Sequence, residues 1–127
     1  MRIYVAAKLR EDVVGSVRAL YARLRALGHV ITHDWTQSDA PAEATAEFWT
    51  RCAVGDAQGV ESADAVIVLH HDKGKGLFVE LGMAIALRKK VIAVGNFAHS
   101  PEALCIFYWA PGVIRVSDED AALAALN

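Results

Sequence analysis

The sequence predicts a three-layer α/β fold, in which helices cover both faces of an open, parallel, Rossmann-like or flavodoxin-like sheet of about five strands. Two observations support this prediction. Strand-like and helix-like segments alternate along the chain, and the runs 63–70 and 90–95 are almost continuously apolar, as strands are when helices cover both faces of a parallel sheet. A chain of 127 residues suffices for one hydrophobic core, so we expect a single domain over 1–127.

The first half of the chain predicts two strands, each followed by a helix. The run RIYVA at 2–6 is a short strand, and apolar residues then recur at helical spacing from 13 to 27, before a glycine that ends the helix. The run HVITHDW at 29–35 is the second strand. A polar loop leads from it into a helix that continues to about residue 62.

The second half predicts a βαβ unit, then a last strand and a last helix. The strand 63–70 leads through a glycine-bearing loop into the helical segment LFVELGMAIALRKK, and the strand 90–95 follows. The aromatic cluster Phe107, Tyr108 and Trp109 belongs to a short helix or loop. VIRV at 113–116 is the last strand, and SDEDAALAAL closes the chain as a helix with Ser117 as its N-cap.

The composition excludes several classes of partner. The formal net charge is −2 and lysine and arginine form no run, so we expect no nucleic acid polymer as partner. Cys52 and Cys105 are too few for a disulfide framework, and we interpret them as small core residues in a reducing compartment. No signal peptide is evident, and no apolar stretch reaches the ~20 residues of a membrane-spanning helix. We therefore expect a cytoplasmic protein with no membrane partner.

Basic residues and glycines gather where the strands are predicted to end, which is where ligands bind in such sheets. The loop after the first strand carries Lys8 and Arg10, and the loop 70–76 carries two lysines and two glycines. Two basic pairs and two glycines that face one crevice favour an anionic or polar small molecule as ligand.

Glu80 is the only ionisable residue between Gly76 and Leu87, in a segment that is otherwise apolar on all sides. That composition predicts a buried helix. A buried carboxylate is costly unless it is paired or used, and in the first turn of a helix the N-terminal dipole would hold it anionic, as a nucleophile requires. A structural glutamate paired with a core arginine is the alternative.

Asp56 is the second candidate carboxylate, in the predicted helix that precedes the central strand. Two carboxylates in different environments suit the cleavage of a glycosidic bond. One attacks the anomeric carbon, and the other manages protons or the leaving base. A solvated aspartate on a polar helix face is the alternative interpretation.

Three segments, in this order and at these spacings, resemble the nucleoside 2-deoxyribosyltransferase family, including its relatives that hydrolyse 2'-deoxynucleoside 5'-monophosphates. They are IYVAAKLR near the start, Asp56 eight residues before the Asp64 of SADAVIVL, and GKGLFVELGMAIALRKKVIAVG. The resemblance covers most of residues 2–95. It implies transfer or hydrolysis at the N-glycosidic bond of a nucleoside or its 5'-monophosphate, and we expect no cofactor.

The resemblance implies a role for each matching residue. Glu80 is similar to the nucleophile that forms a covalent deoxyribosyl-enzyme before another base or water takes the sugar. Asp56 matches the carboxylate that orients the sugar or assists departure of the base, and Tyr4 matches a tyrosine that hydrogen-bonds the nucleophile. Arg10 matches an arginine that helps to hold the 5'-phosphate. An ordinary strand aromatic and a solvated arginine are the alternatives for Tyr4 and Arg10.

The loops that would hold the substrate depart from the family pattern. Lys8 stands where the hydrolases have a phosphate-binding hydroxyl residue, and Gly74, close to Gly76 in the same loop, replaces a polar position. These departures leave the 5' group of the substrate open, although a lysine also suits phosphate. The family builds its pockets across subunits, which implies a homodimer or larger homo-oligomer, and Asn96 is a candidate for such a shared pocket.

The remaining motifs have competing interpretations. A metal site at His70, His71 and Asp72 is disfavoured, because adjacent histidines at a strand end point in opposite directions and no spaced third ligand is evident. The aromatic residues of the segment 35–49 suit either stacking on a base or a core and lid role.

Two alternative functions follow from the fold class. A catalytically silent nucleotide-binding or regulatory module would keep the fold and the crevice without turnover. A receiver-like domain needs acidic residues at the ends of the first and third strands, where this chain has Ala6, Ala7 and His70, so it is disfavoured.

Overall fold

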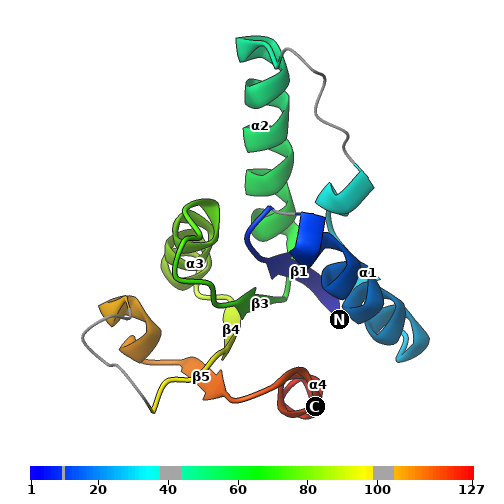
Figure 1. Ribbon diagram of the computed structural model, residues 1–127. Coiled ribbons are helices and arrows are strands. Elements are labelled where there is room, and N and C mark those ends of the chain that lie inside the picture. Colours follow the sequence, from blue (N-terminus) through cyan, green and yellow to red (C-terminus); the bar gives the residue numbers. More distant parts are fainter. Residues whose placement is uncertain (10, 38–43, 99–104) are drawn as a thin grey trace.

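The computed structural model describes residues 1–9, 11–37, 44–98 and 105–127, and these residues form one five-stranded parallel sheet flanked by helices (Figure 1). The predicted three-layer α/β fold is therefore confirmed. The strands are β1 (Arg2–Ala6), β2 (Val30–Ile31), β3 (Ala65–Leu69), β4 (Lys90–Val94) and β5 (Val113–Val116). The helices are α1 (Glu11–Ala26), α2 (Ala46–Ser62), α3 (Gly76–Ala86) and α4 (Glu119–Ala125), with the 3-10 turns η1 (Trp35–Gln37) and η3 (Ile106–Trp109).

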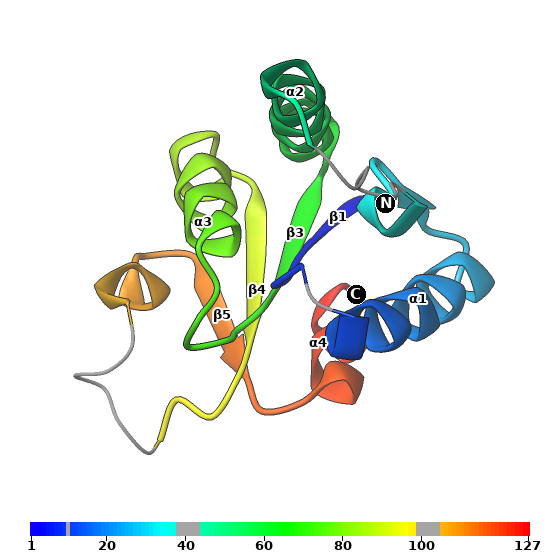
Figure 2. The same cartoon turned by 45° about the horizontal axis from the view of Figure 1, so that its top comes forward.

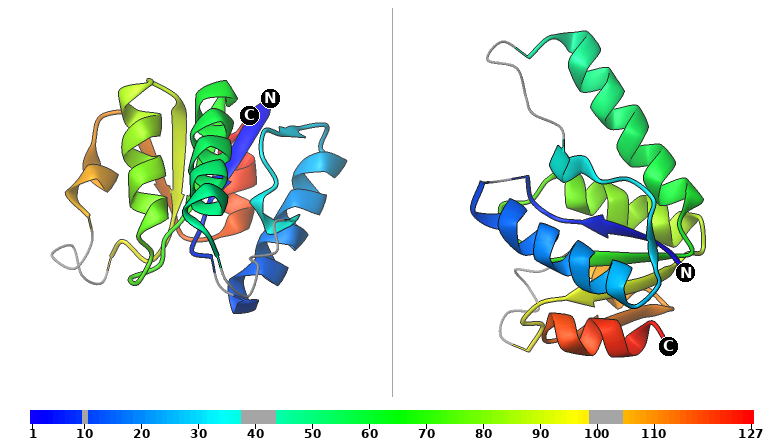
Figure 3. Two further views of the ribbon diagram at one scale, coloured as in Figure 1. Left: turned by 90° about the horizontal axis from the view of Figure 1, so that it is seen from above. Right: turned by 90° about the vertical axis from the view of Figure 1, so that its right-hand side faces the viewer.

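The strand order is β2-β1-β3-β4-β5, and every pairing is parallel. Helices α2 and α3 lie side by side over one face of the sheet, and α1 and α4 cover the other face (Figures 2 and 3). From β1 the chain passes through α1 to one edge of the sheet, whereas from β3 it passes through α3 toward the other edge. The topological switch point therefore lies between β1 and β3, where ligands bind in open α/β sheets.

The core is built from the central strands and the inward faces of α1 and α3. The residues Ile3 to Ala6 of β1 and Ala65 to Val68 of β3 are buried, and they pair with one another along the register Ile3↔Ala65 to Ala6↔Val68. Val17, Leu20 and Leu24 of α1 are fully buried beneath the sheet, at the helical spacing that predicts this helix. This rigid centre fixes the ends of β1 and β3 relative to each other.

Strand β2 is shorter than the predicted 29–35. It pairs with β1 only over Val30–Ile31. After Thr32, whose N–H still bonds the Ile3 carbonyl at 2.9 Å, the chain turns toward the carboxyl end of β1, where the Trp35 indole donates to the Val5 carbonyl at 2.9 Å. Tertiary bonds thus replace the strand ladder that the β-branched sequence suggests.

Three other details differ from the predictions. Helix α3 is not buried on all sides, since Val79 is 64% exposed. The N-cap of α4 is Asp118, whose side chain accepts from the Ala121 N–H, and not Ser117. Cys52 and Cys105 are free and half-buried; Cys105 packs against the core, whereas Cys52 is not one of the core residues.

Within the described ranges, no helix is both long and apolar enough to cross a membrane.

Candidate active site

An open cavity of about 960 Å³ lies at the carboxyl ends of β1 and β3, under helices α2 and α3. It coincides with the topological switch point, the position that the fold predicts for a ligand. The lining residues come from β1 and its loop, the segment after β2, α2 and the start of α3: Tyr4, Ala7, Lys8, Leu9, His33, Trp35, Phe48, Trp49, Arg51, Cys52, Ala53, Asp56, Lys73, Lys75, Gly76 and Glu80. The three predicted catalytic residues therefore share one cavity.

Glu80 lies in the second turn of α3, and only 8% of the residue is exposed. Burial raises the pKa of its carboxyl group to about 8, the Tyr4 hydroxyl lowers it, and the charge of Asp56 raises it. The expectation of a first-turn acid that the helix dipole holds anionic was wrong, because Gly76 begins the helix a full turn earlier and desolvation outweighs the dipole. The group is a desolvated acid, poised to ionise slightly above neutral pH.

Tyr4 lies on β1 with its side chain fully buried. Burial, followed by the charges of Glu80 and Asp56, raises the pKa of its hydroxyl far above the ordinary value. Within the described part of the chain, two buried side-chain atoms have no hydrogen-bond partner of acceptable geometry, the Tyr4 hydroxyl and Glu80 Oε2. Buried polar atoms without partners cost about 1–3 kcal/mol each, so this pair forms a costly polar recess at the wall of the cavity.

Asp56 faces the same recess from α2, with 37% of its side chain exposed. Burial raises the pKa of its carboxyl group, while the His33 imidazole and the Tyr4 hydroxyl lower it. The imidazole Nε2 lies 3.5 Å from Asp56 Oδ1. The two carboxyl groups of the site thus have different environments, and Asp56 is the more solvated of the two.

Two glycines let α2 lie unusually close to this cluster. A β-carbon on Gly59 would lie 2.7 Å from Tyr4 Cδ2 and 2.8 Å from His33 Cβ, and one on Gly55 would lie 3.0 Å from His33 Cε1. Glycine inside a helix costs roughly 0.5–1 kcal/mol relative to alanine. The two glycines therefore make α2 less stable as a helix but allow it to pack closely against Tyr4 and His33. Sequence reasoning missed His33, for which the glycines on either side of Asp56 are the available signal.

Basic side chains surround the cavity on several sides. Lys8 follows β1, Arg51 comes from α2, and Lys73 and Lys75 come from the loop before α3. Lys8 is one of the predicted substrate-binding residues, and Lys73 and Lys75 are the two lysines of the loop that the sequence predicts to face the crevice. Arg51 lies on a helix whose orientation toward the crevice the sequence does not reveal.

The other predicted substrate-binding residues lie in different places. Gly76 lines the cavity. Gly74 does not, since it is buried against Leu77, whose Cδ2 would lie 2.1 Å from an added β-carbon. Asn96 is exposed after β4 and is not part of the cavity wall. Arg10 lies outside the described residues.

Aromatic side chains form the apolar part of the cavity wall. Trp35 is buried, whereas Phe48 is half-buried and packs edge-on against the exposed Trp49, with ring centroids 5.2 Å apart. Trp35 therefore has a core role, and Phe48 and Trp49 line the cavity where an apolar ligand group can pack.

The histidines at the end of β3 have structural partners. His70 contacts the Tyr108 hydroxyl through Nδ1 and Asp72 Oδ1 through Nε2, each at 2.9 Å, and its ring packs edge-on against Phe78. His71 Nδ1 accepts from the Lys73 N–H at 3.1 Å. Among the residues that the structure describes, no group of three or more potential ligands is arranged for a metal ion.

Comparison with known proteins gives one family and several structures of the same fold. The sequence model of the family described as nucleoside 2-deoxyribosyltransferase matches residues 3–112. No curated protein matches the chain.

The solved structures are distant in sequence. A CMP N-glycosidase from Clostridium botulinum, BcmB, has a TM-score of 0.68 at 19% identity, over 99% of this chain and 98% of its own. A 2-deoxyribosyltransferase from Bacillus psychrosaccharolyticus has a TM-score of 0.75 at 19% identity, over 96% and 90%. A conserved protein from Enterococcus faecalis V583 has a TM-score of 0.64 at 19% identity, over 98% and 95%.

Proposed function

The chain belongs to the nucleoside 2-deoxyribosyltransferase family, and from this we propose that it cleaves or transfers the N-glycosidic bond of a nucleoside or nucleotide through a covalent glycosyl ester on Glu80. The observation that carries the proposal is the buried Glu80 carboxyl group, whose Oε2 has no hydrogen-bond partner among the described residues, at the wall of a cavity large enough for such a molecule. In a purely structural glutamate we would expect both oxygens to be paired. Once ionised, this carboxylate is a desolvated nucleophile.

The proposed reaction has two steps. In the first, a Glu80 carboxylate oxygen attacks the anomeric carbon, the bond from that carbon to the base nitrogen breaks, and the base leaves with the bonding electrons and a proton. In the second, water or another base attacks the same carbon and releases Glu80. Asp56 lies on the other side of the recess, where it handles the proton of the base or orients the sugar, and the Tyr4 hydroxyl donates to whichever carboxylate is charged.

The charge of the cavity wall favours a 5'-monophosphate over a neutral nucleoside. Four basic residues, Lys8, Arg51, Lys73 and Lys75, line the cavity together with only two acidic ones. The whole chain has a net charge of −2, so this concentration of positive charge is local. A structural neighbour, the CMP N-glycosidase, is named for a monophosphate. We therefore place the phosphate among these cations and the base against Phe48 and Trp49.

We further propose that the chain works as a homo-oligomer. Ile106, Phe107 and Trp109 are exposed apolar residues within the single short turn η3, and large exposed apolar side chains that gather on one part of a surface are typical of an interface. Sedimentation of the purified protein tests this. A species of one chain's mass at micromolar concentration would contradict it.

The experiment that tests the proposed reaction follows base release and base exchange by chromatography. The purified protein is incubated with deoxyribonucleosides and ribonucleosides and their 5'-monophosphates, with and without free adenine or cytosine. We expect base release or exchange from at least one monophosphate, and loss of activity in a folded Glu80→Gln variant. Unchanged activity in that variant would remove Glu80 from the mechanism. Nucleotide binding without turnover across the panel would favour a silent nucleotide-binding module.

A further inference from the structure

Departure of the base makes two demands on the site. Glu80 must lose its proton to attack, yet a proton must reach the departing base. Glu80 is more deeply buried than Asp56, so a single proton shared between the two carboxyl groups favours the nucleophile, where it blocks the reaction. A second proton is needed on the Asp56 side of the recess.

We propose that His33 is a positioning residue that acts through Asp56, holding its carboxyl group toward Tyr4 and replacing the proton that Asp56 gives to the departing base. This inference rests on the proposed function. The contact that carries it is the 3.5 Å separation of His33 Nε2 and Asp56 Oδ1.

Two glycines of α2 make room for His33 next to Asp56. Gly55 and Gly59 lie one helical turn apart, on either side of Asp56, and a β-carbon at either position would press on His33. Because both positions lack a side chain, the His33 side chain can pack closely against α2 beside the Asp56 carboxyl group. A histidine in contact with Asp56 by chance would not need two helical glycines.

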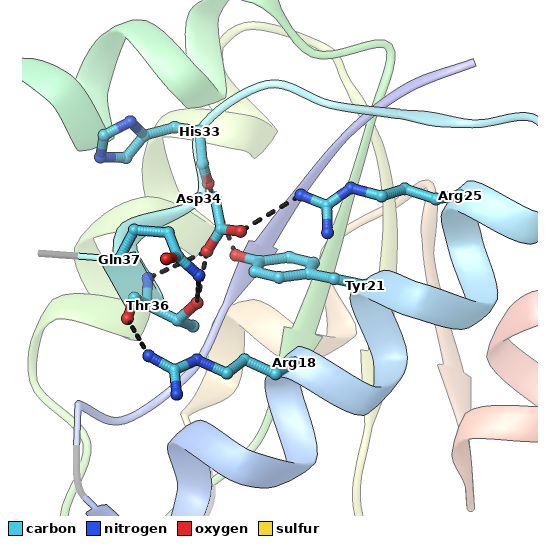
Figure 4. Close-up of polar contacts among 7 residues, drawn as sticks. All are labelled: Arg18, Tyr21, Arg25, His33, Asp34, Thr36 and Gln37. Atoms are coloured by element: carbon cyan, nitrogen blue, oxygen red, sulfur yellow. Dashed lines mark hydrogen bonds and ion pairs between the residues drawn. The ribbon is translucent and has the colours of Figure 1, made fainter.

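The backbone at His33 is fixed from three directions. On one side, Thr32 donates its hydroxyl to the Gly59 carbonyl at 2.7 Å. The Tyr21 hydroxyl donates to the His33 carbonyl at 3.4 Å. On the other side, Asp34 accepts from Arg25 at 3.1 Å and from the Thr36 backbone and hydroxyl. Figure 4 shows the His33 side chain pointing away from this Asp34 network.

His33 is also within reach of solvent. It lines the main cavity and, in addition, a shallower groove of about 510 Å³ along the C-terminal half of α2, with Thr32, Gln58 and Glu61 on its walls. The imidazole is 32% exposed. A proton can therefore pass between the bulk solvent and Asp56 through this ring while the substrate fills the main cavity.

The protons balance across the two steps. As the bond between the anomeric carbon and the base breaks, Asp56 gives its proton to the base, and His33 Nε2–H gives its proton to Asp56. In the second step the attacking water, or the N–H of an incoming base, returns one proton to the Asp56 and His33 pair. Glu80 begins and ends as a carboxylate.

Several charged and titratable groups surround the His33 imidazole. Asp56 faces it from α2, and Tyr4 from β1. Tyr21 of α1 and Asp34 lie at its backbone, and Lys8 and Arg51 line the same cavity. Of these, Asp56 is the one in ion-pair contact with its ring. Removal of the imidazole should therefore affect the Asp56 carboxyl group more than the other groups.

The test compares a leaving base that needs a proton with one that does not. Wild-type protein and His33→Gln are assayed on a purine nucleotide that the wild type cleaves and on its N7-methylated form, whose base already carries a positive charge. We expect kcat of the variant to fall about 100-fold on the ordinary nucleotide and only about threefold on the methylated one, with KM nearly unchanged. His29→Gln, the same substitution at the opposite end of β2, is the control and should match the wild type.

A second measurement does not depend on activity. Since His33 lowers the pKa of the Asp56 carboxyl group, that pKa should rise in His33→Gln, followed by carboxyl carbon NMR with Asp56→Asn to assign the signal. Equal losses of kcat on both nucleotides, or an unchanged Asp56 pKa, would overturn the role of His33. If the wild type cleaves nothing while the Asp56 pKa rises as expected, the proposed reaction fails and the coupling of His33 to Asp56 stands. His33→Asn serves for all these measurements should the glutamine variant not fold.

Discussion

Tyr4 on β1 and Glu80 on α3 present the two buried side-chain oxygens that lack a hydrogen-bond partner in the described part of the chain. The two residues lie on different elements, and both face the cavity at the switch point of the sheet. Each residue shifts the pKa of the other. The negative charge of Glu80 raises the pKa of the Tyr4 hydroxyl, whereas the Tyr4 hydroxyl lowers the pKa of the Glu80 carboxyl group. The hydroxyl is therefore placed to stabilise Glu80 as a carboxylate.

The first prediction concerns the pH dependence of kcat/KM. Because Glu80 reacts as a carboxylate and its pKa is about 8, we expect kcat/KM to rise about tenfold per pH unit below that pH. In Tyr4→Phe this rise should move to higher pH, since the group that lowers the Glu80 pKa is gone. Steady-state kinetics between pH 5 and 10 measure both profiles. A profile that is flat from pH 5 to 8 would contradict the assignment of Glu80.

The second prediction concerns stability. The folded-state pKa of Glu80, about 8, lies above the ordinary value of 4.5, so the folded protein holds a proton that the unfolded chain has lost, and the free energy of unfolding falls as pH rises between these values. Glutamine does not titrate, so in Glu80→Gln the part of this fall in the free energy of unfolding that comes from residue 80 disappears. We expect the variant to be more stable than wild type by about 1–4 kcal/mol at pH 9 and nearly equal at pH 4.5.

Urea unfolding at the two pH values measures this difference. Glu61→Gln, the same substitution at an exposed residue of α2, is the control and should show no comparable pH-dependent gain. Destabilisation of Glu80→Gln at pH 9 would mean that the folded protein binds the Glu80 carboxylate through a favourable partner.

The sequence predicts most of the sheet well, because the patterns that indicate its strands and helices lie within short segments of the chain. The apolar runs of β3 and β4 and the helical period of α1 follow directly from side-chain burial. β2 is misjudged because its Thr32 and Trp35 bond to distant backbone groups, at Ile3 and Val5, and no local pattern records such bonds.

The site divides in the same way. Glu80 is recognisable because a lone acid in an apolar segment is anomalous, and Asp56 because its spacing resembles a family pattern. His33 is not, since a single histidine in a strand-like run is not unusual by itself, and its contact with Asp56 depends on how closely α2 packs. Arg51 lines the cavity because of the orientation of α2, which only the assembled fold determines, whereas Lys75 belongs to a loop that the sequence already predicts to face the crevice.

The third prediction tests the close packing of α2. Gly59→Ala places a β-carbon 2.7–2.8 Å from Tyr4 and His33, closer than real β-carbons approach. We expect a loss of about 1–3 kcal/mol from overpacking, together with a fall in kcat as Asp56 moves. Gly82→Ala is the matched control, since this helical glycine of α3 has open space at its β-carbon, and it should gain about 0.5–1 kcal/mol from helix propensity. Thermal unfolding separates the two, and equal stability changes would refute the packing argument.

The fourth prediction concerns the cations of the cavity wall. Arg51, Lys73 and Lys75 come from two separate elements, so neutralising any one of them should weaken binding of a 5'-phosphate while the Glu80 recess stays intact. In Arg51→Gln and Lys75→Gln we expect KM for the monophosphate to rise about tenfold, with little change for the corresponding nucleoside. The advantage of monophosphate over nucleoside should shrink as salt rises, because ions screen these exposed charges. Lys90→Gln, at the opposite end of the sheet, should leave both KM values unchanged. If KM rises equally for nucleoside and monophosphate, these side chains contact the sugar or base and the phosphate lies elsewhere.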